Sequence, residues 1–128
     1  MVLDSSAIVA IHFQEPDHDQ LMAAIDGAEI VLVGVPTILE VTMVLSARLR
    51  QDARPRVRAF LRHIEAEVVS FNQDHLDAAI TAFLRFGRGR HPAGLNFGDC
   101  MSYAIAAIAG LPLLFTGEDF AQTDIARA

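Results

Sequence analysis

Short, uninterrupted apolar segments alternate with helical segments along this chain of 128 residues, and this alternation limits what it can fold into. Strands that are apolar on both faces belong to parallel sheets that helices cover on both sides. The expected strands are 2–3, 30–33, 68–71 and 113–115, and the expected helices are 5–13, 18–26, 36–50, 54–67, 74–86 and 99–110. The pattern predicts an α/β fold, and the length suits one domain over residues 1–128.

The cysteine content and the apolar segments suggest where such a chain works. Cys100 is the only cysteine, so no disulfide is expected and a reducing, cytoplasmic compartment is the default. The most apolar window, 101–115, is shorter than a membrane span and contains Gly110 and Pro112. No basic leader precedes the first apolar stretch. We therefore expect neither a secretory signal nor a membrane helix.

The net charge of −6 hides an uneven distribution. Residues 1–47 carry seven acids and no base, whereas 48–90 carry nine of the ten arginines. The chain has no lysine, which excludes a receiver-type signalling domain. A phosphatase of the haloacid dehalogenase type would place Asp-x-Asp after the first strand, but Ser6 stands in the second position.

Four acids follow expected strands or open the next helix, namely Asp4, Glu40, Asp99 and Asp119. In a parallel sheet these positions meet beyond the carboxyl ends of the strands. Two such charges about 5 Å apart repel by roughly 3 kcal/mol at an effective dielectric constant of 20, so a cation is needed among them. Oxygen ligands without His or Cys favour Mg²⁺ or Mn²⁺. Such an ion suits phosphodiester hydrolysis.

Each acid except Asp4 also has a purely structural interpretation. Thr37 to Glu40 has the letters of a capping box, Asn96 can cap a helix that carries Asp99, and Asp119 can cap a short helix toward Gln122. Asp4 lies between apolar and small residues, where an unpartnered carboxylate is costly. The neighbouring polar residues Ser6, Asn96 and Thr116 either orient the acids and an attacking water or form ordinary cap and turn hydrogen bonds.

These residues together resemble a known family. Asp4-Ser5-Ser6-Ala7, Glu40, Leu95-Asn96-Phe97-Gly98-Asp99 and Thr116-Gly117-Glu118-Asp119-Phe120 resemble the ordered acidic motifs of the PIN domain. The length and layout of the whole chain are similar to the VapC toxins of toxin–antitoxin pairs. The last motif departs from the family's frequent Thr-x-Asp-x-Asp-Phe by one residue. Asp119 is chosen because Phe120 follows it, with Glu118 as the competing fourth acid and Asp124 as a more remote one.

The resemblance implies a Mg²⁺- or Mn²⁺-dependent endoribonuclease that cleaves structured RNA such as tRNA or rRNA. It also implies a homodimer and inhibition by a cognate VapB-type antitoxin. The catalytic and metal-binding acids would then be Asp4, Glu40, Asp99 and Asp119. The alternative is a catalytically inactive PIN-like module that binds RNA or protein, which the presence of all the expected acids disfavours.

The basic and apolar segments are candidates for binding partners. Arg88, Arg90 and His91, in a glycine-rich loop before Asn96, are candidate RNA-binding residues. For the arginines of the 54–67 helix a solvated face is favoured. The apolar sides of the 36–50 and 99–110 helices are candidates for dimer or antitoxin contacts, although most of these residues are expected in the core. An antitoxin arginine inserted among the carboxylates would occupy the cation's place.

Overall fold

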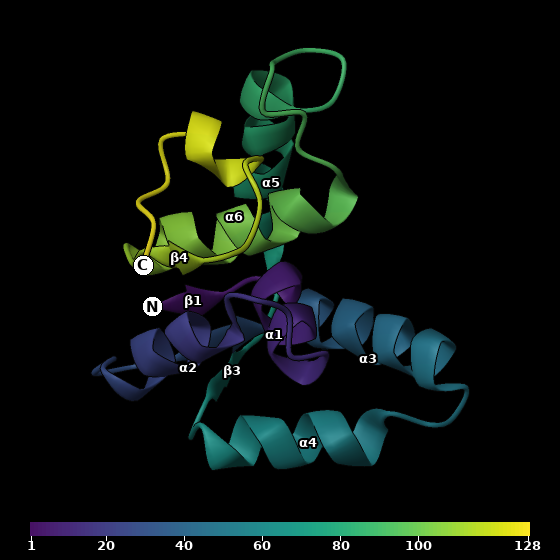
Figure 1. Ribbon diagram of the computed structural model, residues 1–128. Coiled ribbons are helices and arrows are strands. Elements are labelled where there is room, and N and C mark those ends of the chain that lie inside the picture. The colour runs from purple at the N-terminus through teal and green to yellow at the C-terminus, as the bar shows by residue number, and fades with distance from the viewer.

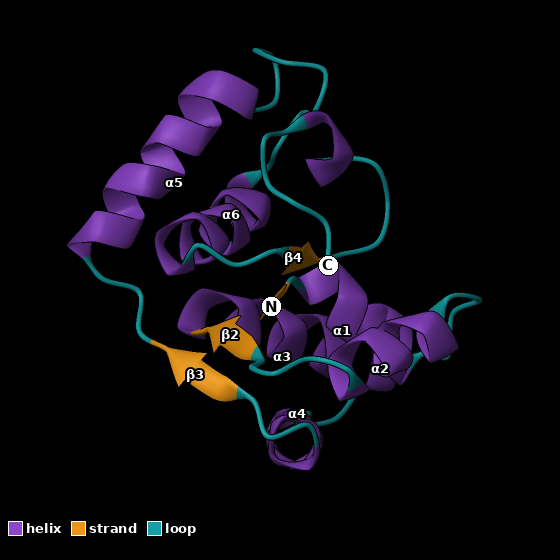
Figure 2. Cartoon of the chain, turned by 90° about the vertical axis from the view of Figure 1, so that its left-hand side faces the viewer, coloured by secondary structure: helices purple, strands orange, loops and turns teal.

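The computed structural model describes all 128 residues and confirms the α/β fold. Four parallel strands form one sheet in the order β3-β2-β1-β4 (Figures 1 and 2). They are β1 (Val2–Leu3), β2 (Leu32–Gly34), β3 (Glu67–Val69) and β4 (Leu113–Leu114). Val2 pairs with Leu32 on one side and with Leu113 on the other. All four strands therefore end at the same edge of the sheet.

Six helices cover the two faces of this sheet (Figure 1). The helices are α1 (Ser5–His12), α2 (His18–Asp26), α3 (Val35–Leu49), α4 (Arg54–His63), α5 (Gln73–Phe86) and α6 (Phe97–Ala109), followed by a short 3₁₀ helix, η1 (Phe120–Gln122). Helices α5 and α6 lie on one face, and α1 to α4 lie on the other. None of the helices has the length and apolar character needed to cross a membrane.

Two hydrophobic cores result from the alternation of side chains along the strands. Val2, Leu32 and Leu113 pack into the core with α5 and α6. The next residues, Leu3, Val33 and Leu114, pack into the core with α1 to α4. Successive strand residues point to opposite faces, so even these short strands contribute to both layers.

Two expected elements differ from the structure. The helix predicted over 54–67 ends at His63, because Glu65 adopts a left-handed backbone conformation with φ of 52°. The strand predicted over 68–71 is Glu67–Val69, and Val68 is 55% exposed, so β3 is an open edge strand. The other elements begin and end within two residues of the expected positions.

Helices α3 and α6 are joined by a buried hydrogen bond. The hydroxyls of Thr37 on α3 and Ser102 on α6 lie 3.2 Å apart, and both residues are almost fully buried. This contact fixes the relative position of the two helices that carry Glu40 and Asp99. A buried hydroxyl that loses its partner is costly, so the pair stabilises the fold only when both members are present.

We expect Thr37→Val to lower the free energy of unfolding by about 1–2 kcal/mol, because it leaves the Ser102 hydroxyl without this partner. The double variant Thr37→Val/Ser102→Ala should recover part of that loss. Thr42→Val on the same helix is the control, since the Thr42 hydroxyl bonds only to the Ile38 carbonyl of its own helix. Urea denaturation measures these variants together with Ser102→Ala alone. A double variant that loses as much stability as the two single variants combined would contradict the coupling.

Candidate active site

Asp4 stands directly beyond β1 and begins α1. Its Oδ2 accepts hydrogen bonds from the Ser6 amide at 2.9 Å and from the Ser6 hydroxyl at 2.6 Å. Its Oδ1 is buried and has no hydrogen-bond partner, and the residue as a whole is 2% exposed. A buried carboxylate oxygen without a partner is costly, so this atom is suited to a ligand that the chain itself does not supply.

Ser6 connects Asp4 to the end of β4. While its hydroxyl donates to Asp4, the same oxygen accepts a hydrogen bond from the Thr116 amide at 3.1 Å. The Asp4 carboxylate is thereby held in one orientation from two strands. The Thr116 contribution comes from its backbone rather than from the side chain.

Glu40 is half-buried on α3. Burial raises the pKa of Glu40, the charge of Asp4 raises it further, and a hydrogen bond from Ser5 opposes the shift. The capping-box interpretation of Thr37 to Glu40 is wrong, because α3 begins at Val35 and Thr37 bonds to Ser102 instead. Glu40 therefore does not cap its own helix.

Gly98 brings the start of α6 against the Glu40 carboxylate. A Cβ atom at position 98 would lie 2.5 Å from Glu40 Oε2 and 3.0 Å from Oε1. Only a residue without a side chain permits this approach. Gly98 belongs to the Leu95–Asp99 motif, but the sequence alone does not indicate that it makes room for Glu40.

Asp99 both caps α6 and faces the other acids. Its Oδ2 accepts a hydrogen bond from the Asn96 amide at 2.7 Å, and the Asn96 side chain accepts one from the Asp99 amide at 3.0 Å. Burial raises the pKa of Asp99 to about 6, and the charges of Asp4, Asp119 and Glu40 add to that shift, while the Asn96 bond opposes it. The capping interpretation is thus correct for Asp99 without excluding the acidic cluster.

Of the three candidates for the fourth acid, Asp119 is the one whose charge acts on Asp99. Asp119, and not Glu118, is among the carboxylates that raise the pKa of Asp99. Asp119 precedes η1 but makes no capping hydrogen bond with its side chain. Asp124 is engaged elsewhere, because it accepts a hydrogen bond from Tyr103 at 2.7 Å and pairs with Arg85 at 2.8 Å.

The donor set suits a hard cation, although the side chains do not form a closed cage. The four residues offer only carboxylate oxygens, one of which is the orphaned Asp4 Oδ1, and none of them forms an ion pair within the chain. No three His, Cys, Asp or Glu side chains are arranged to hold one ion as they stand. Loading would therefore require the carboxylates to move closer together.

Two basic side chains of the glycine-rich loop between α5 and α6 pack against aromatic rings of α5. The Arg90 guanidinium lies 5.1 Å from the centre of the Phe83 ring. His91 packs edge-on against Phe86 and accepts a hydrogen bond from the Ala93 amide, which gives it a structural role. Arg88 is exposed and lines an apolar groove together with Asn96 and Phe97.

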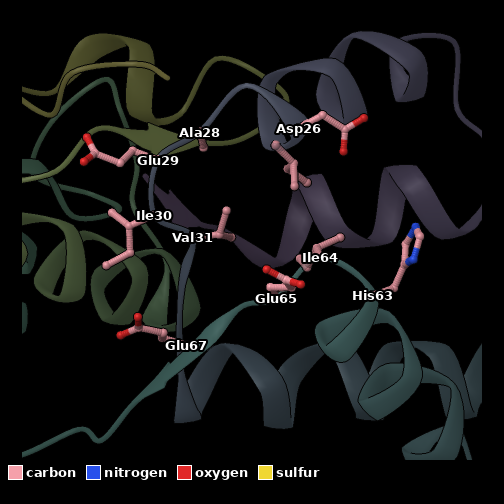
Figure 3. Close-up of a pocket in the computed structure, with 10 residues that line it drawn as sticks. Asp26, Ala28, Glu29, Ile30, Val31, His63, Ile64, Glu65 and Glu67 are labelled. Carbon is pink, nitrogen blue, oxygen red and sulfur yellow. The ribbon is translucent and has the colours of Figure 1, made fainter.

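Another hollow lies at the opposite edge of the sheet, beside the starts of β2 and β3 (Figure 3). It also has acids on its rim, but Figure 3 shows the carboxylates of Asp26, Glu29 and Glu67 pointing apart. None of its polar side chains is buried without a partner. The convergent carboxylates are at the carboxyl edge of the sheet, as expected for a doubly covered parallel sheet.

Comparison with known proteins gives concordant results. A sequence model of the PIN domain matches residues 1–126. The chain is 43% identical over 126 residues to a VapC ribonuclease of Mycobacterium bovis, which covers 98% of this chain and 96% of that protein. It is 40% identical to a ribonuclease VapC of Mycolicibacterium smegmatis, with 98% of both chains covered.

Solved structures share the fold. The crystal structure of Mycobacterium tuberculosis VapC20, described as a sarcin-ricin loop cleaving toxin, superimposes with a TM-score of 0.78 at 15% identity and covers 99% of this chain and 97% of that one. A toxin–antitoxin complex from Klebsiella pneumoniae superimposes with a TM-score of 0.71 at 18% identity, over 96% of this chain and 92% of that one.

The raised pKa of Asp99 makes stability depend on pH. The carboxyl binds its proton more tightly in the folded than in the unfolded chain, so stability should fall as pH rises from 3.8 toward 6. In EDTA at pH 7–8, Asp99→Asn should raise the free energy of unfolding by about 1 kcal/mol, an amount already reduced for partial exposure. The gain should vanish below about pH 4.

Denaturation of both proteins across this pH range measures the effect. The asparagine keeps an oxygen that can accept the Asn96 hydrogen bond, so the cap is preserved in the variant. If the difference in stability between Asp99→Asn and the wild type is the same at every pH, the charge of Asp99 does not destabilise the fold.

Proposed function

The chain belongs to the PIN domain family, and from this we propose that it is a toxin ribonuclease of the VapC type. In this proposal it acts in the cytoplasm as a metal-dependent endoribonuclease, hydrolyses phosphodiester bonds of tRNA or rRNA, and is neutralised by a VapB-like antitoxin. Support comes from curated relatives that are named VapC ribonucleases and align over nearly the whole chain. The related fold found in a toxin–antitoxin complex is consistent with an antitoxin partner.

One observation carries the catalytic part of the proposal. Asp4, Glu40, Asp99 and Asp119 come from separate segments, yet their charges act on one another at the carboxyl edge of the sheet. Such repulsion destabilises the fold and is retained where it serves a reaction. The unpartnered Asp4 Oδ1 lies within this group.

The four acids would hold Mg²⁺ or Mn²⁺. A bound ion of this kind polarises the phosphoryl oxygens and supplies a hydroxide at neutral pH. The chain's own contribution is to orient the ligands. Ser6 fixes Asp4, the Asn96 amide fixes one oxygen of Asp99, and Gly98 leaves room for Glu40. At pH 7 and above Asp99 is mainly ionised and can act as a ligand.

The RNA backbone would be held by cations outside the acidic group. Arg88 and Arg90 are exposed in the loop that leads to Asn96. Guanidinium groups bind phosphates through two parallel hydrogen bonds and offset the repulsion between RNA and an acidic site. An arginine of the antitoxin, placed among the carboxylates in the absence of metal, would block the site by the same chemistry.

A second copy of the chain would cover the apolar surface formed by α3, α5 and α6. Large apolar side chains are exposed there, among them Leu39 at 61%, Met43 at 62% and Phe97 at 80%. Phe97 borders two apolar grooves that are continuous through Met101. Exposed apolar surface of this extent marks an interface, which favours the homodimer.

We expect Asp4→Asn and Asp99→Asn each to lower Mg²⁺-dependent RNA cleavage by at least about 100-fold, because each removes a charged ligand of the ion. Cleavage of a labelled tRNA by the antitoxin-free protein measures this. Asp26→Asn, the same chemical change at the opposite edge of the sheet, is the control and should cleave normally. Unchanged cleavage in both site variants would exclude the metal mechanism, whereas a wild type that binds RNA without cleaving it would favour the inactive module.

A further inference from the structure

Helix α4 carries a row of arginines on its exposed side. Arg54, Arg58 and Arg62 follow one another at every fourth position and are all exposed, whereas Val57 and Leu61 are buried on the other side. Residues four apart lie on the same face of a helix, about 6 Å apart along its axis. We call these three residues the arginine ridge. A hollow runs along the ridge and is lined by the three arginines, Asp52 and Pro55.

Only one of the three arginines of the ridge has an acidic partner within the chain. Asp52 pairs with Arg54 at 2.8 Å, and the pKa of Asp52 falls to about 2, chiefly through Arg54 and to a smaller extent through Arg58. Arg58 and Arg62 form no ion pair. Glu65 borders the adjoining hollow without pairing with either arginine. Like charges four residues apart disfavour a helix, so the ridge does not serve the stability of α4.

The ridge is separate from the candidate active site. Helix α3 packs against both α6 and α4, and α4 lies on its outer side, at the bottom of Figure 1. The carboxylates lie between α3 and α6 at the carboxyl edge of the sheet. The arginines of α4 therefore cannot belong to the group of residues that surrounds the scissile phosphate, and sequence alone favours only a solvated face for them.

We infer that the arginine ridge is a second anchoring surface for the RNA backbone, which holds a part of the substrate remote from the cleaved bond. The inference rests on the proposed function, since that names RNA as the substrate. A regular row of guanidinium groups matches a polymer that carries a charge on every unit. The hollow that all three arginines share is lined, apart from Pro55, only by charged side chains. Apolar side chains of the kind that occupy the centre of a protein interface line only the adjoining hollow at Arg58 and Arg62, where Leu61, Ala66 and Val68 lie.

Binding measured without metal tests the ridge independently of cleavage. The probe is a fluorescein-labelled oligouridine of about 20 nucleotides, followed by anisotropy in EDTA between about 50 and 200 mM salt. We expect Arg58→Gln/Arg62→Gln to weaken binding about tenfold at the lowest salt. The slope of log K against log salt should become shallower by about 1.4, because each phosphate contact to a single strand contributes about 0.7.

Two further variants separate local contacts from net charge and from misfolding. Gln20→Glu/Gln73→Glu changes the net charge by the same amount at exposed positions on α2 and α5, and should leave the salt slope unchanged. Arg58→Lys/Arg62→Lys keeps both charges and should retain the wild-type slope. Thermal unfolding checks the fold, which removal of like charges should not weaken.

The inference is overturned if the glutamine variant binds RNA as the wild type does, or if the control variant loses as much affinity. It is also overturned if the glutamine variant loses affinity only for the VapB-type antitoxin, which would make the ridge a protein-docking surface. Failure of the wild type to cleave RNA in Mg²⁺ would instead count against the proposed function, and would leave a ridge-dependent loss of binding intact.

Discussion

The buried carboxylate of Asp4 is the interaction on which the organisation of the site depends. One of its oxygens is satisfied twice by Ser6, and the same serine reaches the backbone beyond β4, so the ends of two neighbouring strands are joined through one side chain. The other oxygen is left without a partner. Its charge acts on Glu40 and on Asp99, whose own positions are set by α3 and α6. The fold thus confines carboxylates that repel one another at one edge of the sheet.

Helix positions could be predicted from sequence where local signals agree. Asn96 and Gly110 delimit α6 because the asparagine caps its first turn and the glycine adopts the left-handed conformation at its end. The end of α4 could not be predicted in this way, since Glu65 adopts that conformation without being a glycine. The exposure of Val68 depends on β3 having no neighbour on one side, which is a property of strand order and not of the local sequence.

The four candidate acids can be picked out from their order along the chain, whereas their environments are visible only in the structure. Sequence could not decide between capping and clustering for Asp99, and the structure shows that one carboxylate does both. The Thr37–Glu40 segment matches the sequence pattern of a capping box but does not form one, because the Thr37 hydroxyl bonds to Ser102 on α6. The four candidate acids are some 20 to 115 residues apart along the chain, so the distances between them follow from packing, which no local pattern encodes.

Gly98 shows that the placement of the Glu40 carboxylate depends on more than the acidic residues themselves. The side-chain oxygens of Glu40 occupy the space where any larger residue at position 98 would begin. A relative that retained all four carboxylates but carried alanine or serine at this position would have to displace Glu40 or the first turn of α6. When related sequences are sorted into active and degenerate members, the residue before the third acid therefore carries information of the same kind as the acids themselves. A count of acidic positions alone would miss this difference between two such chains.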